Sequence, residues 1–439
     1  MISKIFFEIK NLLLFEFLTM VKKDLIIRYS ILLLPFSLVF SIFISELILF
    51  ILMLFYVKDN FKHKQKINSL FIFFLISYFF YISISSVYLF ENFRITSPFF
   101  NFRFLLYGAA IFYYLNYYKL YEILIKSFIL ISIVLIIDAI FQFSFGYNII
   151  GLPLINGNRV SSFFDDELIL GSFLIRLLPF FLIFFILNFK NKNKTLITYL
   201  FFLSFVIVLS GERTALFLLI FFIIITFFQI PNVRKVIFLS LIFFVFLITL
   251  LVNFNSNYYE RYLYNTLNSF GVIKEADGKF IKSLKFFDEN DKLIKPNIFS
   301  QQHQDHYVTA YMMFKDNKLF GHGTKSFRIL CKEPKYRISK INCATHPHNI
   351  TMQFLSELGL IGISFLIIFH FYLFSELFKI SNLKVSKIEK KVLILSLIGV
   401  LVNVFPLIPS GNFFNNWLSI ILMLNLTNYL FLKNKFLNA

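Results

Sequence analysis

The chain passes from a long polar segment into a strongly apolar helix at residues 346–362, which read His-Pro-His-Asn-Ile-Thr-Met-Gln-Phe-Leu-Ser-Glu-Leu-Gly-Leu-Ile-Gly. This junction holds the imidazoles of His346 and His348 beside the amide of Asn349. Gly359 and Gly362 follow at a spacing of three, which predicts the close approach of another helix. An ionisable group at the end of a membrane helix is costly to keep there and usually has a function. His348 is therefore a candidate base in an active site at the membrane boundary.

Apolar runs near 20 residues recur along the whole chain and define its class. Of the 439 residues, 58% are hydrophobic and only 15% are charged, against about 25% charged in soluble domains. Each run is long enough to cross roughly 30 Å of hydrocarbon. The sequence predicts an all-α polytopic membrane protein. Its net charge of +19 comes from basic residues in short gaps between apolar runs, so nucleic acid is not an expected partner.

About twelve transmembrane helices are predicted, nine within residues 29–253 and three within residues 349–439. Residues 1–28 mix apolar and charged side chains and resemble an interfacial helix on the cytoplasmic face. Residues 254–348 are polar and form one large loop between spans 9 and 10. The first two spans share one apolar run, which we expect to break near Ser45-Glu46. The predicted spans are 29–43, 45–57, 68–88, 99–116, 123–145, 167–187, 196–210, 214–230, 236–253, 349–376, 392–405 and 414–432.

Charge asymmetry orients these spans. Lysines cluster in alternate gaps, such as 58–67, 188–195 and 377–391, whereas the short gaps on the opposite side contain no lysine. Cytoplasmic loops carry the excess of Lys and Arg. Both termini are therefore predicted to be cytoplasmic, and the large loop lies outside.

Both cysteines, Cys331 and Cys343, fall in this loop. Two cysteines in an oxidising compartment favour a disulfide, with free thiols as the alternative. A zinc site is less favoured, because the two thiols would need His346 and His348 as the other ligands.

Arg213 lies in Ser210-Gly-Glu-Arg-Thr, a hairpin with almost no loop between two spans. Its planar guanidinium suits a bidentate grip on phosphate. The alternative is that Arg213 pairs with Glu212 or extends to lipid headgroups.

A second exterior segment holds Arg159, Asp165 and Glu167, and Arg176 follows within the next span. These groups suit hydrogen bonding to a sugar, but Asp165 at a helix N-terminus is better explained by capping.

Asp138 and Gln142 share one face of an apolar helix. We expect a structural role more than an ion path, with Arg103 or Arg176 as the cationic partner.

Exterior arginines and one well-placed histidine suit transfer from a lipid-linked diphosphate, because arginines stabilise the departing diphosphate and a neutral histidine accepts the acceptor's proton. The stretch His348-Asn349, nine residues and then Gly359-Leu-Ile-Gly362 resembles the signature of the bacterial O-antigen ligase and O-antigen polymerase superfamily (Wzy_C-type membrane glycosyltransferases). The Ser210-to-Arg213 element, the segment beginning at Arg159 and the turn Leu319-Phe-Gly-His-Gly323 also resemble family features. The resemblance covers about residues 130–375.

This resemblance implies an inverting, metal-independent glycosyltransferase of the GT-C class, without a cofactor, in the bacterial inner membrane. Its donor would be an undecaprenyl-diphosphate-linked glycan, its acceptor lipid A–core or another glycan, and its large loop and active site would be periplasmic. His348 would be the base and Arg213 would hold the diphosphate. The family often has an arginine some eighteen residues before the glycine turn, where this chain has His303 followed by His306. The candidates for donor or acceptor binding are Arg159, Arg176, His303, His306, Asn349 and Glu357.

Three functions stay open from the sequence. A ligase would move a finished glycan to its acceptor, and the match around His348 slightly favours it. A polymerase would extend the lipid-linked chain. A transporter of lipid-linked glycans is less favoured. Transporters often have two related halves and polar groups near the membrane midplane, whereas the polar groups of this chain are predicted on the outer face.

Overall fold

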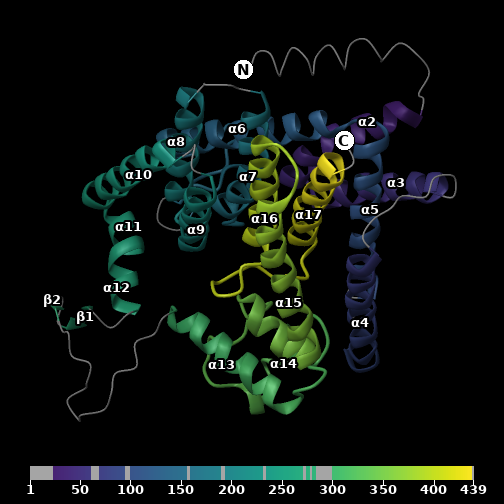
Figure 1. Ribbon diagram of the computed structural model, residues 1–439. Coiled ribbons are helices and arrows are strands. Elements are labelled where there is room, and N and C mark those ends of the chain that lie inside the picture. Colours follow the sequence, from purple (N-terminus) through teal and green to yellow (C-terminus); the bar gives the residue numbers. More distant parts are fainter. Residues whose placement is uncertain are drawn as a thin grey trace.

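A computed structural model describes residues 23–60, 69–93, 99–155, 159–188, 193–230, 234–269, 273–276, 279–282 and 299–437. This part of the chain is almost entirely helical, and a helix lies in each predicted apolar run (Figure 1). One antiparallel hairpin joins β1 (Ile273–Ala276) to β2 (Lys279–Lys282). The helices of the apolar runs are α2 (Lys23–Phe40), α3 (Ile42–Asn60), α4 (Ser69–Phe93), α5 (Arg103–Tyr117), α6 (Tyr121–Phe145), α7 (Leu170–Asn188), α8 (Asn193–Leu209), α9 (Arg213–Gln229), α10 (Arg234–Phe254), α15 (Ile350–Asn382), α16 (Lys387–Asn403) and α17 (Asn416–Leu437). The shorter helical elements are η1 (Phe99–Phe102), η2 (Ser162–Phe164), α11 (Ser256–Tyr258), the π-helix η4 (Tyr259–Tyr264), α12 (Asn265–Ser269), α13 (Gln301–Asp316), α14 (Phe327–Leu330) and η5 (Pro334–Tyr336).

Among the described residues, four helices are long and apolar enough to cross a membrane, namely α4, α6, α7 and α15. A fifth crossing is possible if the bent pair Phe238–Phe254 and Ser256–Leu267, whose axes differ by 113°, counts as one span. Helices α8 and α9 are apolar but shorter. The described chain is thus a multi-helix membrane protein, and the count of twelve spans stays a prediction.

Helix α16 forms the centre of the apolar core, between α7 and α17 (Figure 1). It begins with a capping box, in which Ser386 and Glu389 bind each other's backbone N–H groups. A capping box gives hydrogen-bond acceptors to backbone N–H groups that otherwise have none at the N-terminus of a helix. At Gly399, a Cβ atom would lie 2.6 Å from Asn425 Oδ1 and 2.9 Å from Pro179 Cγ. A larger residue would therefore separate the three central helices.

The N-terminal boundaries differ from those predicted. The break between the first two helices falls at Ser41, not at Ser45-Glu46. Glu46 lies inside α3 because Arg103 of α5 neutralises it, with Nη2 2.9 Å from Oε1. Residues 23–28 begin α2 instead of completing an interfacial segment, and residues 1–22 lie outside the described residues.

Helix α15 is interrupted at Gly359, which has φ 63° and ψ −158°. Gly321 opposes it with φ 67°. A Cβ on Gly359 would lie 2.5 Å from Leu319 O, and one on Gly321 would lie 2.5 Å from Glu357 C. The expectation that the glycines receive another helix is therefore wrong: the turn at residues 318–323 crosses α15 here, backbone against backbone.

Hydrogen bonds between this turn and α15 replace those that the interruption removes. Buried backbone groups need such partners, and the turn supplies both donors and acceptors. The pairs are His322 N to Ser356 O, Gly323 N to Glu357 O, Leu360 N to Lys318 O and Ile361 N to Leu319 O, and the Tyr81 hydroxyl of α4 donates to Leu358 O.

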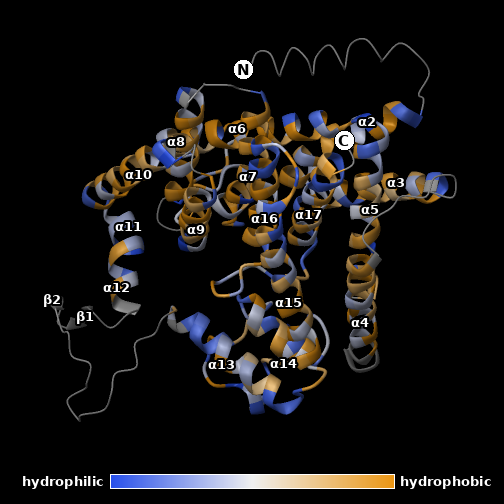
Figure 2. Cartoon of the chain, viewed as in Figure 1, coloured by the Kyte–Doolittle hydropathy of each residue, from blue (hydrophilic) through white to orange (hydrophobic). Residues whose placement is uncertain are grey.

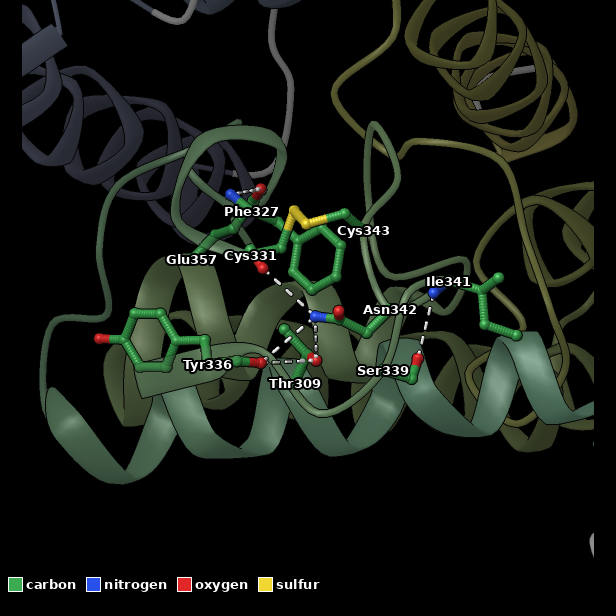
Figure 3. The surroundings of a disulfide bond; sticks show 9 residues. All are labelled: Thr309, Phe327, Cys331, Tyr336, Ser339, Ile341, Asn342, Cys343 and Glu357. Carbon is green, nitrogen blue, oxygen red and sulfur yellow. Dashed lines mark hydrogen bonds between the residues drawn. A yellow bond between two sulfur atoms is a disulfide. The ribbon is translucent and has the colours of Figure 1, made fainter. Parts of the chain in front are cut away.

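The segment from α13 to η5 forms a small polar module at the end of the molecule away from α2 and the C-terminal end of α17 (Figure 1). Hydrophilic residues are frequent on α13, whereas α4, α6 and α10 are mainly hydrophobic (Figure 2). A disulfide joins Cys331 of this module to Cys343 in the loop that follows η5 (Figure 3). The Asn342 amide donates to Cys331 O at 3.2 Å and to Thr309 Oγ1 at 2.9 Å, which ties the disulfide loop to α13.

Candidate active site

His348 sits immediately before α15 with a left-handed backbone, φ 57°. Such a conformation is strained for a residue other than glycine, and strain of this kind clusters at functional sites. Contacts on both sides hold it. Ser410 N donates to His348 O at 2.8 Å, while the side chain of the next residue, Asn349, accepts from Met352 N and caps the helix.

Asn349 also fixes the neighbouring loop, because its Nδ2 donates to Pro406 O and Ile408 O. Asn349 therefore caps α15 and anchors the loop, so both polar atoms of its amide have partners within the protein and a substrate is not needed to explain them.

Four histidines meet at this point. The ring of His348 lies 4.0 Å from that of His346, 5.2 Å from that of His306 and 5.3 Å from that of His303, measured between centroids. His303 and His306 lie three residues apart on α13 and so share one face of that helix. Helix α13 thus brings two histidines to the pair that precedes α15.

Burial lowers the pKa of each histidine in the cluster, and for His303, His346 and His348 the neighbouring rings lower it further. The pKa falls to about 3 for His348 and to about 4 for His346 and for His303. Burial is also the main cause of the lowered pKa of His306, which the charge of Asp305 partly opposes. At neutral pH these imidazoles are uncharged and able to accept a proton.

The hydrogen bonds of His346 fix its tautomer. Nε2 lies 3.1 Å from Ser410 O, which only accepts, so this nitrogen carries the proton. Nδ1 then accepts from the Thr345 hydroxyl at 2.9 Å.

Three arginines gather around the hairpin before α9. Arg159 Nε donates to Ser210 O at 2.8 Å, and Arg261 Nε donates to Gly211 O. A Cβ on Gly211, which has φ 67°, would lie 2.9 Å from both Nε atoms. Arg213 follows two residues later and reaches Thr266 Oγ1 at 3.5 Å. Burial and the charge of Arg261 lower the pKa of Arg159 to about 10.

The arginine cluster lies within electrostatic reach of the histidine cluster. The charge of Arg213 is one of the causes that lower the pKa of His303, whose ring packs on His348. The structure therefore groups four histidines around His348 and three arginines around the hairpin before α9, and a shared active site stays a prediction.

Glu212 does not pair with Arg213. Its carboxylate accepts from Gly171 N at 2.6 Å and from Ser172 N at 3.1 Å, and so caps α7 from the neighbouring hairpin. The expectation that Asp165 caps this helix is wrong, because α7 begins only at Leu170 and Asp165 is exposed with φ 50°. Glu167 is likewise exposed. Desolvation raises the pKa of Glu212, although these hydrogen bonds oppose the shift.

Arg176 and Glu357 both have structural partners within the protein. Arg176 donates to Asn403 Oδ1 and Ser172 O and lies over the ring of Trp417. Glu357 is fully buried. It accepts from Phe327 N (Figure 3) and from Gln353 Nε2. Neither contact set supports a direct role in substrate binding.

Asp138 likewise pairs with neither Arg103 nor Arg176. It accepts from the Ser162 hydroxyl at 2.5 Å and from Ile149 N at 2.9 Å, which confirms the expected structural role and corrects its partners.

Arg261 and Arg328 were missed from the sequence. Arg261 lies among tyrosines just past the apolar run of α10, a position that suggests the membrane boundary but not the bend that returns it to Gly211. Arg328 follows the glycine turn, and its charge lowers the pKa of His346. In the described chain, no three His, Cys, Asp or Glu side chains are placed to hold a metal ion.

Fold and site together define a polytopic membrane protein with an arginine and histidine site at a helix boundary. Residues 198–367 match the family model described as O-Antigen ligase. This range holds Arg213, Arg261 and all four clustered histidines, and Arg159 lies outside it. This match agrees with the resemblance seen in the sequence, which is thereby confirmed over these residues, and members of the matched family are membrane glycosyltransferases. No curated protein matches the chain significantly.

Proposed function

We propose that the protein transfers a glycan from undecaprenyl diphosphate to an acceptor hydroxyl on the periplasmic face of the bacterial inner membrane, as an O-antigen ligase does. The observation that supports this proposal is a cluster of four histidines around His348, with the charge of Arg213 acting on one of them, His303. The arginine cluster suits a diphosphate, and the histidine cluster supplies a neutral base.

Arg159, Arg213 and Arg261 hold the donor diphosphate in this proposal. Three guanidinium groups held close together repel one another, and a polyanion relieves that repulsion. Arginine offers paired N–H donors in a fixed geometry that matches phosphate oxygens. As the glycosidic bond breaks, negative charge grows on the diphosphate and these donors stabilise it.

His348 acts as the base. The acceptor oxygen attacks the anomeric carbon, the bond from that carbon to the diphosphate oxygen breaks, and the hydroxyl proton passes to the His348 imidazole. A pKa of about 3 in the donor-free protein makes His348 a weak base alone. The negative charge of a bound diphosphate raises that pKa, because an opposite charge favours the protonated ring. Donor binding thus prepares His348 to accept the proton.

Lipopolysaccharide from cells that lack this chain tests the proposal, with the undecaprenyl-linked pool analysed alongside. A ligase predicts loss of long surface chains while polymer accumulates on the lipid carrier. A polymerase, the alternative, predicts a single repeat still attached to core.

A transporter, the third possibility, predicts that repeat units accumulate on the cytoplasmic side. Re-expression of the His348→Ala variant distinguishes it, because transport does not need the base and would be restored. The break in α15 weighs against a transporter, since the turn at residues 318–323 fills it.

A further inference from the structure

The turn at residues 318–323 belongs to the polar module but lies beside a membrane span. Helix α4 contains the apolar stretch Leu70–Val87, which is long enough to cross a membrane. The Tyr81 hydroxyl, from within that stretch, is shared between Leu358 O at 2.7 Å and Phe320 O at 3.1 Å. Tyr81 lies six residues before the end of the stretch, which is about 9 Å at the helical rise of 1.5 Å per residue. The turn is therefore level with the apolar part of α4.

Helices α4 and α15 pack side by side in opposite directions (Figure 1). Successive rings of α4 meet successively earlier rings of α15, with centroid distances of 4.4 Å for Phe71 and Tyr372, 6.4 Å for Phe74 and Phe369, and 5.6 Å for Tyr78 and Phe365. Tyr81 beside Leu358 is the next step of this series. The break of α15 at Gly359 consequently lies alongside the apolar stretch of α4 and not beyond its outer end.

The backbone of the turn is suited to an environment without water. All four carbonyl groups of residues 318–321 accept a hydrogen bond from within the protein. The donors are Leu360 N to Lys318 O at 2.8 Å, Ile361 N to Leu319 O at 3.2 Å, the Tyr81 hydroxyl to Phe320 O at 3.1 Å and Asn317 Nδ2 to Gly321 O at 2.6 Å. Non-helical backbone at membrane depth must satisfy its polar groups in this way, whereas a turn in water can leave them to solvent.

The exposed side chains around this crossing are mainly apolar. Leu319 and Phe320 of the turn are 50% and 54% exposed, and Leu360 of α15 is 48% exposed. On the neighbouring part of α4, Phe80 and Ile84 are 67% and 53% exposed. Apolar exposure on this scale marks a surface that something covers. Because the surface is continuous with the side of α4 that faces lipid, hydrocarbon chains are the cover that fits it.

We propose that the turn at residues 318–323 is inserted into the outer leaflet of the membrane and anchors the polar module there. Leu319 and Phe320 lie among the lipid chains. Lys318 is exposed, and its long side chain carries the ammonium group up to the lipid headgroups. The partner of this surface is the bilayer itself, and the large loop between spans 9 and 10 is then only partly in water.

This depth has a consequence for the histidine cluster. Ile350 lies eight residues before Leu358, about 12 Å along α15 at 1.5 Å per residue, whereas the apolar stretch of α4 ends about 9 Å beyond Tyr81 by the same rise. His348, two residues before Ile350, is thereby held just outside the hydrocarbon, at the depth of lipid headgroups. A lipid-linked diphosphate has its charged group at this depth. The match between His348 and the donor rests on the proposed function, but the depth of the turn does not.

Electron paramagnetic resonance of a nitroxide at position 320 tests the insertion. Both native cysteines form the disulfide, so a label reacts with the introduced thiol of Phe320→Cys. Phe80→Cys on α4 is the lipid-facing control, and Arg337→Cys, at an exposed position after η5, is the control for water. Each full-length protein is placed in vesicles of phosphatidylethanolamine and phosphatidylglycerol. Relaxation of the label is measured with oxygen, which concentrates in hydrocarbon, and with a water-soluble nickel chelate.

The ratio of oxygen to nickel relaxation at position 320 should match that at position 80 and exceed that at position 337. A ratio equal to that at position 337 would overturn the insertion. Protection from both reagents would also overturn it, because protein and not lipid would then cover the turn. Leu319→Cys repeats the test in case Phe320→Cys does not fold. No donor or transfer step enters the measurement, so failure of the proposed transfer chemistry would leave the result intact.

Discussion

Asp138 in α6 is a buried polar group and His348 before α15 is a half-buried one, and the side chains that surround them differ in kind. Asp138 is surrounded by donors: the Ser162 hydroxyl, Ile149 N and the Asn148 amide. His348 is surrounded by other imidazoles, each of which disfavours its charged form. The donors around Asp138 satisfy its carboxylate and fix a loop, whereas the imidazoles around His348 disfavour its protonation until a bound anion favours it.

Replacing His348 should give the largest loss of activity. His348→Asn tolerates the left-handed backbone but has no basic nitrogen, so transfer should fall by about 10²–10⁴-fold, the usual contribution of a general base. Initial rates of glycan transfer by purified protein measure this effect. His370→Asn is the control, because His370 lies on α15 with both ring nitrogens near backbone carbonyls. Equal losses in the two variants would remove the special role of His348.

Arg213→Lys should have the next largest effect. The charge stays but the paired donors are lost, so transfer should fall by about 10²–10³-fold, as when one transition-state donor is removed. Arg261→Lys should lose activity in the same direction, because Arg261 shares Gly211 with Arg159. Arg234→Lys, at the start of α10, is the control. Wild-type kinetics in Arg213→Lys would reduce that residue to a headgroup contact.

Stability should fall as the pH drops from 7 towards 5. In the unfolded chain histidines bind protons below about pH 6.5, whereas the folded pKa is about 4 for His303 and about 3 for His348. The unfolded state therefore binds more protons over this window, and folding weakens as pH falls. The Tm of the wild type and of His303→Gln, measured at pH 7 and pH 5, tests this directly. The fall in Tm between pH 7 and pH 5 should be smaller for His303→Gln than for the wild type. An identical fall would mean that the histidine cluster does not cause the pH dependence of stability.

Asp138→Asn should change activity least. Loss of a buried acceptor costs about 1–3 kcal/mol of stability, so Tm should fall. The transfer rate of the folded variant should stay within about threefold of the wild-type rate. That change corresponds to less than about 1.4 kcal/mol, the free energy of a tenfold effect. A loss as large as that of His348→Asn would place Asp138 in the reaction and end the distinction between the two regions.

Much of the helical architecture was predictable from the sequence, because uninterrupted apolar runs leave little choice of secondary structure. The break at Ser41 was not, since it depends on Arg103 neutralising Glu46 inside α3. The kink at Gly359 was also missed. The glycine spacing indicated close approach, but the partner is a turn forty residues earlier in the chain.

For the candidate site, the family-like spacing predicted His348 and Arg213, whereas Arg261 and Arg328 are brought to it by contacts between distant parts of the chain. Arg261 reaches Gly211 only because the chain bends after α10. Glu212 looked like a partner for Arg213, yet it caps α7 because the free N–H groups of Gly171 and Ser172 attract a carboxylate. Local sequence does not reveal such pairings between separate hairpins.

The most direct test measures donor binding and single-turnover transfer side by side for wild type, His348→Asn and Arg213→Lys. If His348 is the base and Arg213 holds the diphosphate, His348→Asn binds the lipid-linked donor with wild-type affinity but transfers at least about 10²-fold more slowly. Arg213→Lys should lose donor affinity and rate together. Transfer at the wild-type rate by His348→Asn, with donor bound, would contradict the assignment of His348 as the base.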